Sequence, residues 1–134
     1  MNRIMKSEKG QSLILFVVFV PLVVMLGTYV VDVSNARYES NKINNINKIV
    51  IEYGLNHIDD DPKEDMIKLI YQNDEEIDNY MIELDTTNKT IIVELEKSSP
   101  GLFGSIVGKD LYQEKSKYKG YFIEDKMIIE RVDK

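Results

Sequence analysis

Hydrophobic and polar positions divide the chain into one long apolar run and a mixed region that follows it. Leu13 to Val31 are nineteen consecutive residues without a charge, mostly Leu, Ile, Val and Phe. A helix rises about 1.5 Å per residue, so this run covers about 28 Å, close to the thickness of a bilayer core. The pattern predicts a transmembrane helix over residues 11–32.

An apolar run near the start of a chain can also be a secretory signal that is cleaved. Such signals have apolar regions of about 7 to 15 residues and a small-residue cleavage site. Here the run is longer and Asp32 follows it, which favours an uncleaved span. Arg3, Lys6 and Lys9 precede the span, so the positive-inside rule predicts a cytoplasmic N-terminus and an extracytoplasmic C-terminal domain.

Four residues modify the picture of the span. Pro21 removes a backbone donor and crowds the preceding turn, and Gly27 is a second weak point, so a helix kink is expected there. Tyr29 and Asp32 are expected at the outer membrane interface. Asp32 is interpreted as a solvated carboxylate, with pairing to a basic group of a neighbouring copy as the alternative.

The helical pattern continues past the span. Apolar residues recur at spacings of three, four and seven over residues 33–58, which predicts an amphipathic continuation of the same helix. The two parts would form one rod of about 45 residues, roughly 65 Å long. Many asparagines lower helix propensity here, so this half needs tertiary packing. The predicted packing stripe consists of Ala36, Ile43, Ile46, Val50 and Tyr53.

A second helix is predicted near the start of the remaining chain. Asp61 is placed as its N-cap, Pro62 at its first helical position and Glu64 in a capping box, with the helix ending at about Asn73. The acidic run 59–61 raises a calcium hypothesis. It lacks the alternating ligands, glycine and distal Glu of a known calcium loop, so capping and solvation are preferred.

Alternating residues then predict an antiparallel hairpin with one solvated side. Apolar side chains occupy every second position from Tyr80 to Leu84 and again from Ile91 to Leu95, with a polar turn at 86–89 between them. Residues 100–108 predict a helical turn or packed loop.

Two further strands are expected over 111–119 and 121–132, the second divided by a turn at 124–126. The links are too short for crossover helices, so the sheet should be antiparallel. The predicted fold class is α+β: a long N-terminal transmembrane-plus-amphipathic helix, then a small antiparallel-sheet domain with a second helix. The predicted segments are a basic leader or cytoplasmic start (1–10), the span (11–32), the amphipathic continuation (33–58) and the outer domain (59–134).

Composition excludes several functions. The chain has 17 Lys and Arg against 23 Asp and Glu, a net charge of −6, and no cysteine. An acidic domain gives no reason to expect nucleic acid, because that binding depends on basic residues that neutralise phosphates. The one histidine, His57, ends the amphipathic segment, and no phosphate-binding glycine motif is present. We therefore expect no catalytic, metal or cofactor site, and no enzyme.

The segment KGQSLILFVVFVPLVVMLGTYVVDVSNARYESNKINNINKIV combines a basic start, a glycine, a small polar step, an apolar helix with an internal proline, and an Asp before a polar continuation. This order resembles the N-terminal segment of the TadE/TadG-like pseudopilins, the minor pilins of the tight-adherence or Flp-type pilus. The later stretch LFGSIVGKDLYQEKSKYK also resembles a stretch of these proteins. The resemblance implies a prepilin-peptidase cut between Gly10 and Gln11, with Pro21 as the internal proline of the packing helix.

One position departs from that pattern. Processed pilins generally carry a Glu five residues into the mature chain, and Leu15 stands there instead. The resemblance implies a single-pass, membrane-anchored structural component of a pilus assembly or secretion apparatus, at the cell surface or in the pilus. Its implied partners are membrane lipid, other pilin or pseudopilin subunits, assembly proteins and, if the leader is cut, a prepilin peptidase. The alternative is a membrane-anchored extracytoplasmic binding or sensory domain unrelated to pili.

Overall fold

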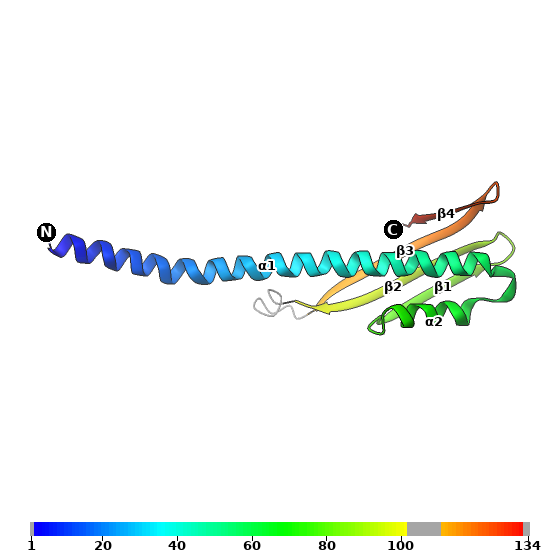
Figure 1. Ribbon diagram of the computed structural model, residues 1–134, viewed down its shortest axis with the longest axis horizontal. Helices are drawn as coiled ribbons and strands as arrows, with labels where there is room; N and C mark the ends of the chain where they lie inside the picture. The colour runs from blue at the N-terminus through cyan, green and yellow to red at the C-terminus, as the bar shows by residue number, and fades with distance from the viewer. Residues whose placement is uncertain (1, 102–110, 133–134) are drawn as a thin grey trace.

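The computed structural model describes residues 2–101 and 111–132 (Figure 1). A long helix comes first, followed by a short 3-10 helix, a second helix and four strands, so the predicted α+β class is confirmed. The elements are α1 (Asn2–Asn56), η1 (Ile58–Asp60), α2 (Lys63–Asn73), β1 (Asn79–Asp85), β2 (Thr90–Pro100), β3 (Leu111–Ile123) and β4 (Lys126–Arg131).

The helix α1 has two halves with different surroundings. Figure 1 shows its first half extending away from the rest of the molecule, while its second half lies along the sheet. Every large apolar side chain from Leu13 to Val31 is exposed. From Ile43 onward the apolar side chains that face the sheet are buried. One continuous helix therefore packs into the domain over its second half and makes no part of the domain core over its first half.

The four strands form one antiparallel sheet in the order β1-β2-β3-β4, as the short links predicted. Strand β2 alternates cleanly: Ile91, Val93 and Leu95 are fully buried, and the residues between them are half-buried. The buried face of the sheet packs against the second half of α1, and α2 packs against the same part of α1.

The core lies between α1, α2 and this face of the sheet. Its apolar area removed from water, at about 25 cal/mol per Å², is the main favourable contribution to folding. The buried residues are Ile43, Ile46, Val50, Ile51, Leu55, Ile58, Met66, Ile70, Ile77, Ile82, Ile91, Val93, Leu95 and Tyr118.

The predicted capping box at α2 is wrong, although the helix ends at Asn73 as expected. Asp61 follows η1 and has φ 49°, a left-handed conformation, whereas an N-cap residue has an extended backbone. Pro62 takes the N-cap position instead, and it makes no side-chain capping hydrogen bond. The need to turn the chain between η1 and α2 therefore overrides the local capping sequence.

The predicted break at Gly120 is also wrong, because β3 runs through this residue to Ile123. A Cβ on Gly120 would overlap the Cγ2 atom of Ile51 and lie 2.9 Å from Leu55 Cδ1. The glycine therefore marks a close approach of α1 to the sheet. The predicted turn after Ile123 is present, with Glu124 and Asp125 at positive φ. The helical turn or packed loop expected over 100–108 is wrong at Pro100, which is the last residue of β2, and its residues 102–108 lie outside the described residues.

Candidate functional site: the exposed half of α1 and its junction with the sheet

The exposed half of α1 is the largest apolar surface in the described part of the chain. Leu13, Phe16 and Phe19 are 64%, 66% and 63% exposed, and the other large apolar side chains up to Val31 are exposed as well. This is the one helix among the described residues that is long and apolar enough to cross a membrane, a test that a signal sequence also passes. An exposed apolar surface of this extent usually marks a contact with a membrane or with another protein.

The residues singled out for the leader cut and for the helix kink all lie in α1. Gly10, Gln11, Pro21 and Gly27 are helical, and α1 continues through each of them. A Cβ at Gly10 or Gly27 would meet no atom within 4 Å, so the backbone there is open to close approach by a neighbouring helix or by lipid. The expected kink and the expected leader cut stay predictions.

The junction between the two halves of α1 lies near Asp32. Tyr29 is 50% exposed, but Asp32 is only 5% exposed, so its interpretation as a solvated carboxylate is wrong. The hydroxyl of Tyr112 donates a hydrogen bond to Asp32 Oδ2 at 3.3 Å, and Gly101 packs against both side chains. Burial, the charge of Asp32 and this hydrogen bond raise the pKa of the Tyr112 hydroxyl. The early part of β3 thus covers the carboxylate.

The predicted packing stripe lies along the half of α1 that faces the domain. Ile43, Ile46 and Val50 are buried, and Ala36 and Tyr53 are partly buried. The Tyr53 hydroxyl also donates a hydrogen bond to Asp65 Oδ2 of α2 at 3.1 Å. The stripe contacts the sheet along part of its length and α2 near its end.

Asn47 was missed by the sequence reasoning and is the polar centre of this contact. It is fully buried, and its Nδ2 donates to the carbonyl oxygens of Val93 and Ser116 at 2.9 and 3.1 Å. These contacts join α1 to β2 and β3. The spacing contained a usable indication, because Asn47 follows Ile43 by four residues and precedes Val50 by three, which places it on the buried face.

Lys97 was also missed, and it is the most buried cation in the described chain. It is 2% exposed, and its Nζ lies 2.6 Å from Glu39 Oε2 and 2.7 Å from Asp74 Oδ2. Lys42 Nζ is 3.5 Å from the same Asp74 oxygen. The cluster connects α1, the segment after α2, and β2, three parts of the chain that are distant in sequence.

The pKa values of this cluster follow from burial and pairing. Burial alone would lower the pKa of Lys97, but its hydrogen bonds to Asp74 and Glu39 and their charges raise it overall. Burial alone would raise the pKa of Asp74, but the hydrogen bond from Lys97 and the backbone N–H of Glu76 lower it overall. Glu114, opposite Lys97 in β3, has a pKa raised by burial and by the charge of Glu39.

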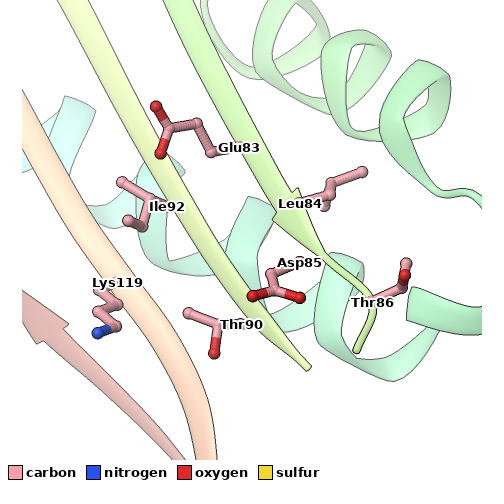
Figure 2. Close-up of a pocket in the computed structure, with 7 residues that line it drawn as sticks. All are labelled: Glu83, Leu84, Asp85, Thr86, Thr90, Ile92 and Lys119. Carbon is pink, nitrogen blue, oxygen red and sulfur yellow. The ribbon is translucent and has the colours of Figure 1, made fainter. Parts of the chain in front are cut away.

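A shallow depression of about 470 Å³ lies on the other face of the sheet (Figure 2). Glu83, Ile92 and Lys119 come from three neighbouring strands and line it, together with the turn after β1. Asp85 is engaged in that turn, where its Oδ1 accepts the backbone N–H groups of Thr87 and Asn88 at 3.1 Å each. This carboxylate oxygen is therefore already used within the turn.

No group of three His, Cys, Asp or Glu side chains that could hold a metal occurs among residues 2–101 and 111–132. The main feature of the described residues is the large apolar surface of α1, a helix that continues without interruption into a small acidic domain. No protein family, curated protein or solved structure matches the chain.

Proposed function

We propose that this protein is a single-pass, membrane-anchored, pseudopilin-like subunit of a pilus assembly or secretion apparatus, and that it acts structurally by helix packing. The observation that carries the proposal is the division of α1. One half exposes its apolar side chains, and the other half forms one side of the core of a four-stranded antiparallel domain.

The contacts of α1 with the domain support a role in fixing the orientation of the domain relative to the helix. Asn47 and the pair of Lys97 with Glu39 hold the helix to the sheet by polar contacts, which have stricter geometric requirements than apolar contacts. The helix continues from these contacts into its exposed half without a break. A subunit whose span packs against other spans would therefore orient its domain relative to the assembly.

The N-terminus would be cytoplasmic and the domain extracytoplasmic, at the cell surface or in a pilus, because Arg3, Lys6 and Lys9 precede the span. A prepilin peptidase would act between Gly10 and Gln11. The intact mass of the membrane-extracted protein tests the cut: loss of residues 1–10 supports it, and their retention excludes it.

Membrane anchoring is tested by charge in the span. The variant Val17→Arg/Val24→Arg should lose membrane retention, because an Arg at a helix centre costs roughly 2.5–3.5 kcal/mol. Ile49→Arg is the matched control, since Ile49 is an apolar residue 47% exposed on the domain half of the same helix. Retention of the double variant would refute the span.

Assembly is tested by photo-crosslinking amino acids placed singly at Leu15, Leu22 and Leu26, with Ile49 as the control position. We expect crosslinks from the three span positions to chains with a similar N-terminal segment, identified by mass spectrometry. Crosslinks to lipid alone would overturn the assembly role and would favour the membrane-anchored binding or sensory domain.

A further inference from the structure

The sheet ends in two edge strands whose outer sides pair with no other strand among the described residues. There β1 pairs with β2 alone, and β4 pairs with β3 alone. Figure 1 shows these two strands at opposite sides of the sheet. Unpaired strand edges are templates for pairing with another chain. Neither β1 nor β4 contains a proline, which would block such pairing.

The two edges have compatible directions. The strands of a four-stranded antiparallel sheet alternate, so β1 and β4 run in opposite directions. When two copies lie side by side in the same orientation, β4 of one copy is therefore antiparallel to β1 of the next. Pairing of β4 with a second β4 would instead reverse one copy, and their α1 helices would point in opposite directions.

The faces and hydrogen-bond directions of the two edges also match. The backbone N–H of Val132 donates to the Lys117 carbonyl, so Met127 and Ile129, at the alternate positions of β4, direct their backbone groups to the open edge. The same alternation, followed across the register of the sheet, directs the backbone groups of Tyr80 and Ile82 to the edge of β1.

One register joins these edges with complementary side chains. Pairing Met127 with Ile82 of the next copy makes an apolar pair on the face covered by α1, and Ile129 then lies opposite Tyr80. On the other face, Ile128 lies opposite Met81, a residue already 37% exposed, and Lys126 lies opposite Glu83.

Other registers are worse. Shifting by two residues in one direction places Ile128 opposite Glu83, and shifting in the other places Lys126 opposite Met81. Charges on strand edges usually discourage pairing. Here Lys126 and Glu83 become opposite charges on directly facing positions, an arrangement that stabilises antiparallel pairs.

We propose that β4 of one copy pairs with β1 of a second copy of this chain, head to tail, in the register that sets Lys126 opposite Glu83 and Ile128 opposite Met81. Each copy would thus bind, through its β4 edge, the β1 edge of the next copy. The choice of β4–β1 over β4–β4 rests on the proposed function, because copies anchored in one membrane share one orientation. Repetition of this contact would build a row of outer domains above the row of spans.

The natural absence of cysteine allows a direct test by disulfide crosslinking. The full-length variant Met81→Cys/Ile128→Cys, in membrane vesicles treated with copper phenanthroline, should form a ladder of dimers, trimers and larger species. The two positions are three strand spacings apart within one chain, about 14 Å, beyond the reach of an intramolecular disulfide. Ile128→Cys alone should stay monomeric in this test, and a dimer from it would show β4–β4 pairing and overturn the proposal.

Glu94→Cys/Lys117→Cys is the matched control, because these residues face each other in one chain and should close within it. Closure of this control without a ladder from Met81→Cys/Ile128→Cys would overturn the proposal. Adding Lys126→Glu to the ladder variant should weaken the ladder, and adding Glu83→Lys as well should restore it. A ladder that is the same with and without these two charge substitutions would refute the register.

The two proposals fail in different ways. Membrane retention without a ladder refutes the edge pairing and leaves the anchoring intact. A ladder formed by a protein that is not retained in membranes refutes the proposed function and leaves the edge contact.

Discussion

The Nζ atom of Lys97 lies 2.7 Å from Asp74 Oδ2, and the two side chains are only 3% and 4% exposed. Each ion would be strongly unfavourable there without the other, because taking a charge out of water costs several kcal/mol. Glu39 adds a second carboxylate from α1, so the cluster ties the long helix to the sheet. Disruption of either partner should therefore loosen the domain from the helix that carries it.

Replacement of Lys97 by methionine tests this directly. Lys97→Met leaves Asp74 and Glu39 close together without the buried cation between them, with only the partly exposed Lys42 still 3.5 Å from Asp74, and we expect a loss of about 3–5 kcal/mol in the free energy of unfolding. Urea unfolding of the full chain in detergent micelles, followed by near-UV circular dichroism of the tyrosines, measures this loss. Lys115→Met is the control: Lys115 is paired with Glu96 at 3.3 Å but its side chain is 56% exposed, so its loss should cost about 0–1 kcal/mol. Equal effects of the two changes would contradict the role of burial.

The pH dependence of stability should reveal the unfavourable effect of the Glu114 charge on folding. Its pKa in the folded protein is raised above the ordinary value of 4.5, so its charge opposes folding at neutral pH. Glu114→Gln should therefore be more stable than the natural protein at pH 7. The difference should shrink as the pH falls through the folded pKa of Glu114 and vanish below about 4.5. Unfolding midpoints from pH 3 to pH 8 measure it, and a difference that does not change with pH would exclude this cause.

The pKa of Asp74 is shifted in the opposite direction to that of Glu114, so the charge of Asp74 favours folding. Its pKa is lowered below 3.8, so its contribution to stability is complete above that pH and is lost as the pH falls through the folded pKa. Asp74→Asn should flatten this acid-side loss of stability in the same unfolding series. If Asp74→Asn loses as much stability at acid pH as the natural protein does, other carboxylates cause that loss.

Asn47 should tolerate no carboxylate. Asn47→Asp removes the Nδ2 donor and places an acceptor beside the carbonyl oxygens of Val93 and Ser116, so a marked fall in the unfolding midpoint is expected. Asn45→Asp is the control, since Asn45 is exposed on the same helix. Comparable midpoints for both variants would show that the buried hydrogen bonds contribute little.

Gly120 should tolerate no side chain. Gly120→Ala forces a methyl group against Ile51 and Leu55, and overpacking of this kind costs about 1–3 kcal/mol. Gly27→Ala is the control, because a methyl group there meets no atom within 4 Å. Unfolding measured as for Lys97→Met distinguishes them, and an unaffected Gly120→Ala would mean that α1 can move away from β3 without loss.

Local patterns in the sequence were sufficient for the type and order of the main helices and strands, though not for the start of α2 or the course of β3 through Gly120. An uncharged run as long as Leu13 to Val31 can be only a buried or membrane helix, and strict alternation from Ile91 to Leu95 leaves one buried face on any strand. The turn at Glu124 and Asp125 and the end of α2 at Asn73 follow from equally local preferences. Such patterns depend on residues within a few positions of each other, so they can be read before the fold is known.

Apart from the indication that spacing gave for Asn47, the tertiary structure decided which polar residues are buried. Lys97 and Asp32 are charged residue types that are usually exposed, yet α1 covers one and β3 covers the other. Asn47 meets Ser116 69 residues away, and Asp32 meets Tyr112 80 residues away. The burial of a charge is settled by whichever distant segment packs over it, and Coulomb interactions then select the partner that makes the burial tolerable. Sequence periodicity contains no information about that distant segment, so the long apolar helix and its packing stripe were predictable from the chain alone, and the polar contacts that attach the helix to the sheet were not.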